Sequence, residues 1–199
     1  MINSGAITYN FGMSLFEEYS PDKRSPAQNA ILKKLHIRKA KTDDTAGIAE
    51  LTAQREQRPI LEVLAIINDE LARMENSDRA ILSVAEIDGR IVGFARATYF
   101  QPDDKAPVNS CPEGWYLTGV IVDPEFRRAG IASKLTTSRL EQIAEKANQA
   151  YYFANAQNRV SIELHEKLGF QEISRDFSYP GVNFVGGQGI LFRIDLSGR

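Results

Sequence analysis

The segment WYLTGVIV at residues 115–122 constrains the fold more than any other, because it is apolar at nearly every position. A strand of this composition is typical of a sheet that is buried on both faces. It ends at Asp123-Pro124, and a helix is predicted from Gly130 to about Ala147, with Leu135 and Leu140 on its inner side. A layered α/β domain with this strand near its centre is therefore expected.

The rest of the chain supplies the partners of this strand. Asp88-Gly89 separates two strand-like segments, and such a pair is typical of a tight hairpin turn. Further strands are predicted at 35–40, 150–155, FQEISRDFSY and GILFRIDL, and further helices after Thr42-Asp43, from Pro59 and over 161–168. The order β-α-α-β-β-β-α-β-α-β-β predicts one α/β domain with a mixed, mostly antiparallel central sheet and flanking helices.

Two regions differ in organisation. Residues 1–34 mix aromatic residues with prolines and show no sustained period, so we expect an N-terminal extension that is partly mobile or packed on the domain. A short helix is expected around Met13–Tyr19. Residues 35–199 form the domain itself, and a loop is predicted at Gln101–Glu113 because it contains three prolines.

Composition excludes several classes of protein. The net charge of −2 argues against a nucleic-acid partner, although only weakly, since neutralising phosphates needs a concentrated basic face. Cys111 is the only cysteine, which excludes an internal disulfide and a cysteine-rich metal site, and no metal is expected. No apolar run approaches the roughly eighteen residues that cross a membrane, and the N-terminus lacks the cationic and apolar regions of a signal peptide. We expect a cytoplasmic protein without a membrane partner.

The segment VIVDPEFRRAGIASKL at 120–135 carries the chemistry. A helix N-terminus has free backbone N–H groups that favour phosphate, and small residues let a diphosphate approach the backbone. Neither the GxxxxGK[ST] spacing of a Walker A loop nor the GxGxxG of a Rossmann fold is present. Taken alone, such a segment is more often an ordinary strand–turn–helix connection than a phosphate site.

Two motifs resemble the GNAT superfamily of N-acetyltransferases. R-R-A-G-I-A at 127–132 matches its Q/R-x-x-G-x-G/A motif, and the segment from Asn158 to Phe170 resembles its N-x-x-[AS]-x-x-L-[YH]-E-x-x-G-F signature. The resemblance covers roughly residues 35–196 and implies acetyl-CoA as co-substrate, bound where strands 115–122 and 150–155 splay apart. A homodimer is common among such relatives.

The resemblance also implies binding residues for acetyl-CoA. The backbone of the splayed strand would bind the pantetheine arm, the loop and helix start would cradle the diphosphate with positive charge nearby, and an asparagine would bond the arm or a nearby backbone group. The strand residues are Val120, Ile121 and Val122, and the asparagine is Asn158. The residues of the loop and helix start are Arg127, Arg128, Ala129, Gly130, Ile131, Ala132 and Ser133.

Three side chains and one backbone group are candidates for catalysis. The backbone N–H of Val120 would stabilise the oxyanion as a neutral amine attacks the thioester. His165 stands where many relatives have a tyrosine acid, so it is predicted either to donate a proton or to be a packing residue beside the cofactor. The base is less defined, because residues 115–118 and Phe153 occupy positions where relatives often have glutamate. Glu113 with Tyr116 as a relay, or a water chain, is predicted instead.

The sequence therefore predicts an N-acetyltransferase that moves an acetyl group from acetyl-CoA to a primary amine of a small molecule. Acidic residues in the 101–113 loop (Asp103, Asp104 and Glu113) would attract a cationic amine. Two alternatives stay open, namely an acetyltransferase for protein N-termini or lysines and a non-catalytic acyl-CoA sensor. The aromatic residues Phe177, Tyr179 and Phe184 form either a substrate lid or the anchor of a turn.

Overall fold

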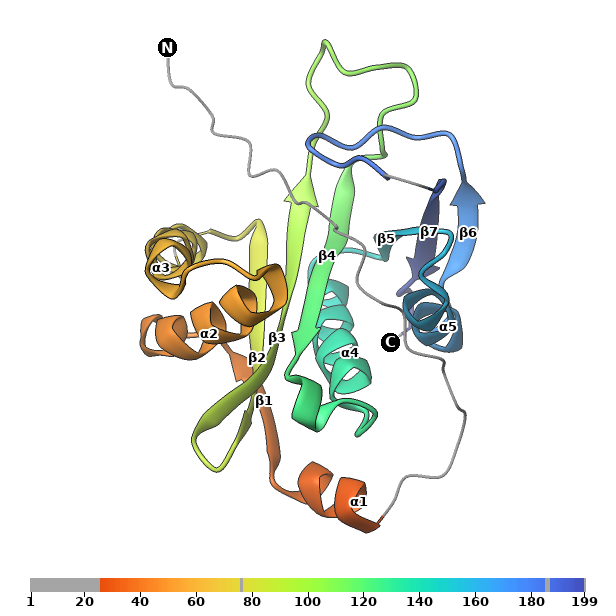
Figure 1. Ribbon diagram of the computed structural model, residues 1–199. Coiled ribbons are helices and arrows are strands. Elements are labelled where there is room, and N and C mark those ends of the chain that lie inside the picture. Colours follow the sequence, from red (N-terminus) through yellow and green to blue (C-terminus); the bar gives the residue numbers. More distant parts are fainter. Residues whose placement is uncertain (1–25, 76, 185–186, 199) are drawn as a thin grey trace.

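A computed structural model describes residues 26–75, 77–184 and 187–198 (Figure 1), so the helix predicted around Met13–Tyr19 lies outside the described part of the chain. The elements follow in the order α1 (Pro26–Lys33), β1 (Leu35–Lys39), η1 (Thr42–Asp44), α2 (Thr45–Glu56), α3 (Ile60–Glu75), β2 (Ala80–Ile87), β3 (Arg90–Phe100), β4 (Gly114–Val122), η2 (Pro124–Phe126), α4 (Ile131–Ala144), β5 (Gln149–Asn155), α5 (Arg159–Lys167), β6 (Gln171–Ser174) and β7 (Gly189–Asp195).

The described strands form one sheet in the order β1-β2-β3-β4-β5-β7-β6. Every neighbouring pair is antiparallel except β4 and β5, which run parallel. Parallel neighbours need a crossover connection, and α4 provides it. The predicted mixed, mostly antiparallel sheet with flanking helices is therefore confirmed, with β4 at its centre.

The two faces of the sheet are covered by different helices because successive residues of a strand point to opposite sides. Val84 and Phe94 pack with α2 and α3 on one face. Their neighbours Ala85 and Ala95 pack instead with Ile131 and Leu135 of α4 on the other face. Figure 1 shows α2 and α3 together on one side of the sheet and α4 on the other.

A β-bulge interrupts the pairing of β3 with β4. Arg96 is opposite Gly119 and Ala97 is opposite Leu117, so Thr118 is an extra residue on β4. Such a bulge bends its strand and increases the local twist. On the other edge of β4, the pairing with β5 covers only three residues and ends at Leu117 opposite Tyr152. The two parallel strands therefore separate where the bulge begins, and this provides the predicted splayed pair.

Two predicted boundaries differ most from the structure. The first is the strand predicted over FQEISRDFSY, which ends at Ser174, because the ladder with β7 stops there and residues 175–179 cross toward the 101–113 loop. The second lies within the predicted extension, where residues 26–33 form α1, and its Ile31 packs against the core cluster beneath α4. This part of the extension is thus packed on the domain.

Candidate functional site

The turn between β4 and α4 is fixed by Asp123, which is 3% exposed. Its carboxylate accepts a hydrogen bond from the backbone N–H of Glu125 at 3.0 Å, which caps η2. The same carboxylate accepts a hydrogen bond from the Arg90 guanidinium at 2.6 Å. A buried carboxylate that is paired in this way holds the chain in one direction as it leaves the sheet.

The N-terminus of α4 has no side-chain cap. Gly130 occupies the N-cap position with φ of 87°, in the left-handed region that glycine adopts without strain. The side chains of Ala129 and Ile131 are buried in the core, so this turn offers backbone rather than side chains to its surroundings. The first N–H groups of a helix lack intrahelical partners and carry partial positive charge, which makes this end of α4 suited to an anion.

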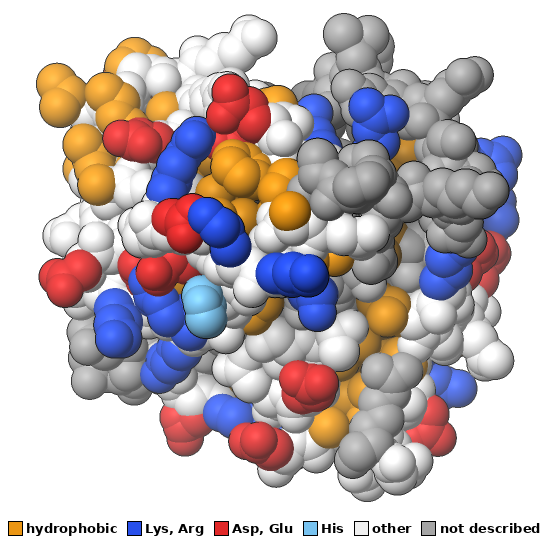
Figure 2. All heavy atoms as spheres, turned by 90° about the horizontal axis from the view of Figure 1, so that it is seen from below, with side chains coloured by type: hydrophobic (Ala, Val, Ile, Leu, Met, Phe, Trp, Pro, Cys, Tyr) orange, Lys and Arg blue, Asp and Glu red, His pale blue; other side chains and the backbone are white. Residues whose placement is uncertain are grey.

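A pocket of about 230 Å³ opens beside this helix end. It is lined by Arg55, Val120, Ile121, Val122, Arg127 and Ala132. Five of the six were predicted as cofactor-binding residues, and the pocket brings them together. Figure 2 views the molecule from below, the side toward which β4 descends in Figure 1, and Lys and Arg side chains stand near the middle of that face.

Arg55, from the last turn of α2, is the residue of the pocket that the sequence did not reveal. Its Nη1 donates to the carbonyl oxygen of Val120 at 3.2 Å. The side chain stays solvent-accessible, but partial desolvation by the surrounding protein is the main cause that lowers the pKa of Arg55. The negative charge of Glu56 raises this pKa, and the positive charges of Arg127 and Arg96 lower it. Arg55 and Arg127 both line this pocket, and two guanidinium groups at one pocket favour a bound anion.

His165 lies in the core beneath the splayed strands. It is 2% exposed, and its ring stacks on Tyr152 with 3.6 Å between centroids and 3° between planes. Nδ1 is 2.7 Å from the carbonyl oxygen of Ser161. A carbonyl oxygen can only accept, so Nδ1 carries the hydrogen and Nε2 presents a lone pair, which has no hydrogen-bond partner.

This environment keeps the imidazole neutral. Burial lowers the pKa of His165 to about 3, the hydrogen bond to Ser161 opposes this shift, and the charge of Arg139 adds to it. An acid must carry its proton at the working pH. The geometry therefore favours the predicted packing role over the predicted acid role, because burial penalises the charged form that an acid would need.

Asn158 serves the backbone in this structure. Its Oδ1 accepts a hydrogen bond from the N–H of Ser161 at 3.2 Å and thereby caps α5. The hydroxyl of Tyr152 donates to Ser161 Oγ at 2.5 Å, which ties β5 to the same helix. Asn158, Tyr152 and His165 thus hold α5 against the splayed pair.

The predicted relay from Glu113 through Tyr116 is absent from this structure. Glu113 accepts a hydrogen bond from the Tyr99 hydroxyl at 2.7 Å, whereas the Tyr116 hydroxyl donates to the carbonyl of Pro112 at 2.7 Å. Tyr99 packs edge-on against Trp115, which points to the face opposite that of its strand neighbour Tyr116. The two predicted residues therefore act on different sides of the sheet.

Tyr116 belongs to an aromatic cluster instead. It is 0% exposed and packs with Tyr151, Phe153 and Tyr179. Phe177 and Phe184 extend the cluster. Burial is the main cause that raises the pKa of Tyr116, and burial also raises the pKa of the neighbouring Cys111 thiol to about 11. Neither group is prepared to act as a base or nucleophile.

Two loops meet over this cluster. Cys111 N–H donates to Ser178 O at 2.9 Å, and Ser178 N–H donates to Asn109 O at 2.8 Å. Asn109 Nδ2 donates to Asp176 at 2.7 Å. Figure 1 shows the loop between β3 and β4 beside the segment that follows β6. The contacts favour the anchored-turn interpretation of Phe177, Tyr179 and Phe184.

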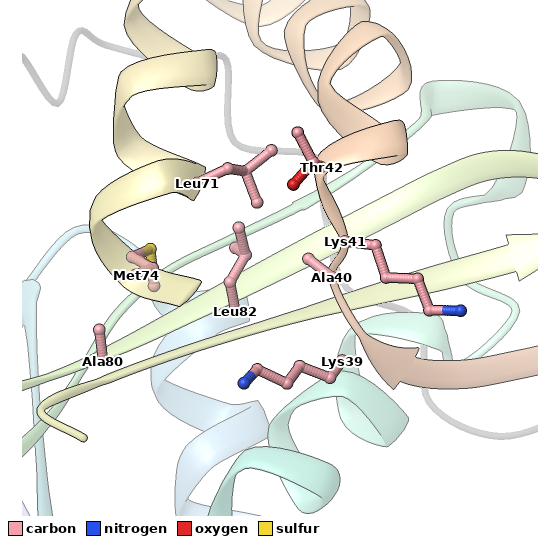
Figure 3. A pocket seen from close by; sticks show the side chains of 8 residues that line it. All are labelled: Lys39, Ala40, Lys41, Thr42, Leu71, Met74, Ala80 and Leu82. Carbon is pink, nitrogen blue, oxygen red and sulfur yellow. The ribbon is translucent and has the colours of Figure 1, made fainter. Parts of the chain in front are cut away.

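A second hollow of about 20 Å³ lies between α3 and the edge of the sheet, where Leu71, Met74 and Leu82 meet (Figure 3). It holds about one water molecule, too little for a substrate. Within residues 26–75, 77–184 and 187–198, no helix is long and apolar enough to span a membrane, and no three His, Cys, Asp or Glu side chains gather as a metal site would require.

A central parallel pair that separates beside an uncapped helix N-terminus, within a mixed seven-stranded sheet, defines a GNAT-type fold. The chain belongs to this acetyltransferase family, since the model described as "Acetyltransferase (GNAT) family" matches residues 40–170, well over half of the chain. The family resemblance drawn from the two motifs is thereby confirmed.

Three curated relatives illustrate the range of the family. An aminoglycoside N(6')-acetyltransferase type 1 from Salmonella typhimurium is 29% identical over 108 residues, which cover 52% of this chain and 70% of that protein. A mycothiol acetyltransferase from Thermomonospora curvata is 32% identical over 103 residues, 51% of this chain and 31% of the relative. The catalytic subunit of the N-terminal acetyltransferase B complex from Arabidopsis thaliana is 41% identical over 63 residues, 29% of this chain and 36% of the subunit. The matched part thus spans only about a third of the last two relatives.

Solved structures share the fold. A structure of yncA from Salmonella typhimurium with its cofactor acetyl-CoA has a TM-score of 0.60 at 20% identity, over 83% of this chain and 96% of that one. A ribosomal-protein-alanine N-acetyltransferase from Brucella melitensis has a TM-score of 0.60 at 23% identity, over 80% of this chain and 99% of that one.

Proposed function

We propose that this chain transfers the acetyl group of acetyl-CoA to a primary amine of a small molecule. The observation that carries the proposal is the end of α4, where uncapped N–H groups meet a pocket of about 230 Å³ between Arg55, Arg127 and the separated strand β4. A diphosphate needs such donors, and a pantetheine arm needs free strand backbone. The acyl donor therefore fits residues that are present here.

The backbone of this chain performs most of the catalysis in this proposal. Residues 131–133 offer their N–H groups to the diphosphate, and Arg127 adds a positive charge nearby. Val120, just past the bulge, directs its N–H at the thioester oxygen, where negative charge develops. The amine nitrogen bonds to the carbonyl carbon, the C–S bond breaks, and the sulfur leaves as a thiolate.

The protons move through water. Glu113 and Tyr116 are engaged elsewhere, so we assign no side-chain base, and water accepts the proton that the amine loses. The leaving thiolate has a conjugate acid pKa of about 8.5 and takes a proton from water near neutral pH. Water thus fills both the acid and the base role, and the protein supplies position and oxyanion stabilisation.

The acceptor side favours a small cationic amine. Hydrogen bonds between residues 109–111 and 176–178 hold two loops together over the aromatic cluster, and a small amine needs less open space beside such loops than a peptide does. Exposed carboxylates surround this end of the molecule (Asp103, Asp104, Glu113 and Asp176). Carboxylates of this kind raise the local concentration of cations.

The proposal is tested by incubating the protein with acetyl-CoA and a panel of aminoglycosides, amino acids, simple diamines and short peptides. Free thiol and product mass are recorded together. Acetylation of small amines at rates well above those of the peptides supports the proposal. Thiol release that does not depend on any amine would contradict it.

Acetylation of protein N-termini is a second candidate, supported by the 41% identity over 63 residues to the N-terminal acetyltransferase subunit. The peptide arm of the same panel distinguishes the two. Peptides with free N-termini would become acetylated at the α-amino group, and blocking that group would stop the reaction while leaving lysine side chains available.

Arg55 supplies a separate prediction about the donor. We expect Arg55→Met to weaken acetyl-CoA binding about tenfold, because a charge-assisted contact to phosphate contributes roughly 1.5 kcal/mol. Calorimetric titration measures this at two salt concentrations, and the difference should shrink at high salt. Arg58→Met is the matched control, since Arg58 pairs with Glu56 and Glu62 away from the pocket. Equal losses in both variants would place Arg55 outside the donor site.

A further inference from the structure

Arg139, in the middle of α4, is a charged side chain in the interior of the protein. It is 1% exposed, and its helix otherwise presents Leu135, Leu140 and Ile143 to the core. Among the described residues no Asp or Glu side chain pairs with its guanidinium. Burying a charge costs several kcal/mol unless hydrogen bonds replace its water. The hydrogen-bond partners of the Arg139 guanidinium therefore indicate the role of this buried charge.

Those partners are the two carbonyls that face each other across the β-bulge. Nη1 donates to Arg96 O at 2.6 Å and to Gly119 O at 3.0 Å, and Nη2 donates to Thr136 Oγ1 at 2.9 Å. Arg96 on β3 and Gly119 on β4 are paired in register, with the extra residue Thr118 immediately before Gly119. One guanidinium thus joins both strands at the irregular step, where the regular ladder is broken.

The bulge has an unusual backbone that needs such support. Gly119 has φ of 155°, a conformation that residues with side chains rarely adopt. The next residue, Val120, begins the stretch that lines the pocket, and β4 has already separated from β5 after Leu117. A change in the bulge would therefore change where the Val120 N–H points.

We propose that Arg139 is a positioning residue for acetyl transfer: by holding the carbonyls of Arg96 and Gly119 together, it fixes the bulge that aims the Val120 N–H at the thioester oxygen. The inference rests on the proposed function. Arg139 keeps its positive charge at neutral pH, although burial lowers its pKa to about 9. A side chain that is shorter or lacks N–H donors could not bond both carbonyls at once.

The test compares Arg139→Lys, Arg139→Met and Thr136→Val. Lysine keeps the charge but reaches one carbonyl at most, and methionine keeps most of the volume without donors. Thr136→Val removes the Nη2 partner and leaves both carbonyl bonds, so it is the control for a loss of stability alone. We expect kcat to fall about 10- to 100-fold in Arg139→Met, less in Arg139→Lys, and under twofold in Thr136→Val.

Two further measurements separate positioning from folding. The acetyl-CoA dissociation constant should stay within about threefold in all variants, because neither Arg139 nor Gly119 lines the pocket. Hydrogen exchange of the Gly119 and Val120 amides should be faster in both Arg139 variants than in Thr136→Val. If Arg139→Met does not fold, the kcat of Arg139→Lys and its hydrogen exchange still decide whether Arg139 positions the bulge.

Different results would overturn different statements. An unchanged kcat in a folded Arg139→Met protein, or equal kcat losses in Arg139→Met and Thr136→Val, would make Arg139 a purely structural residue. A parent protein that neither binds nor consumes acetyl-CoA would instead overturn the proposed function. In that case the exchange comparison would still measure whether Arg139 holds the bulge.

Discussion

Replacing Gly130 with glutamate is expected to abolish acetyl-CoA binding while most of the protein stays folded. Gly130 is the N-cap of α4, two positions before Ala132, which lines the pocket. A carboxylate there brings a negative charge to the positive end of a helix and would take the place of the diphosphate. Calorimetric titration should show a loss of more than about 100-fold, which corresponds to roughly 2.7 kcal/mol.

Two variants at the same position divide the effect into its causes. Gly130 has φ of 87°, so any side chain there costs about 1–2 kcal/mol of stability through backbone strain. Gly130→Ala carries only this strain and should bind acetyl-CoA more weakly by a few fold. Gly130→Gln adds the bulk of glutamate without its charge and should be intermediate. Undiminished binding in Gly130→Glu, with the variant folded by circular dichroism, would locate the donor elsewhere.

Part of the candidate site was predictable because it is local in sequence. Val120, Ile121, Val122, Arg127 and Ala132 lie within one strand–turn–helix segment and line one pocket, whereas their proposed role toward acetyl-CoA rests on the family resemblance. The conformation at Gly130 follows from the same segment, since a helix that starts at a glycine has no side-chain cap. Residues that are close in sequence stay close in the folded protein, so the contacts within a short motif can be predicted from the sequence.

The contacts made by Arg55 and Arg139 could not be predicted in this way. Arg55 reaches Val120 across 65 positions, and Arg139 reaches Arg96 across 43. Nothing in the periodicity of α4 distinguishes a buried arginine from an exposed one, because its partners are carbonyls on other elements. The bulge at Thr118 is equally hidden, since one extra residue in a strand of nine changes no hydrophobic pattern.

Glu113 and Tyr116 bond different partners for a related reason. Glu113 and Tyr116 are three positions apart, which suggests proximity when only the sequence is considered. Strand geometry sends Trp115 and Tyr116 to opposite faces, and Glu113 follows the face of Trp115 by bonding Tyr99. The face on which the Glu113 carboxylate lies depends on its hydrogen bond to Tyr99 of the neighbouring strand β3, which the sequence does not reveal.

His165 gives the second large effect, and it is a dependence of stability on pH. Its pKa is about 3 in the folded protein and 6.5 as the ordinary value for the unfolded chain. Between these values the unfolded chain binds a proton that the folded protein does not bind, so the stability that the neutral imidazole provides above pH 6.5 is lost as the pH falls. The expected slope is about 1.4 kcal/mol per pH unit.

Urea titrations of the parent and of His165→Phe between pH 7 and 4.5 measure this slope. Phenylalanine keeps a flat ring against Tyr152 but has no proton to bind, so the free energy of unfolding of the variant should fall less steeply with acid. His36→Phe, at an exposed position of β1, controls for the removal of a histidine, and any pH dependence it removes is subtracted. Parallel curves for the parent and His165→Phe would mean that the imidazole titrates normally.

The same variant decides between the packing role and the acid role. A buried neutral imidazole predicts that kcat of His165→Phe, measured well below its melting temperature, stays within about tenfold of the parent, because positioned acid catalysis contributes 10²- to 10⁴-fold only when the proton is present. The pH profile of kcat should keep its shape, since Nε2 offers a lone pair rather than a proton. A loss of 100-fold or more that removes the alkaline limb of the profile would show that acetyl-CoA binding raises the pKa of His165 and makes it the acid for the leaving thiolate.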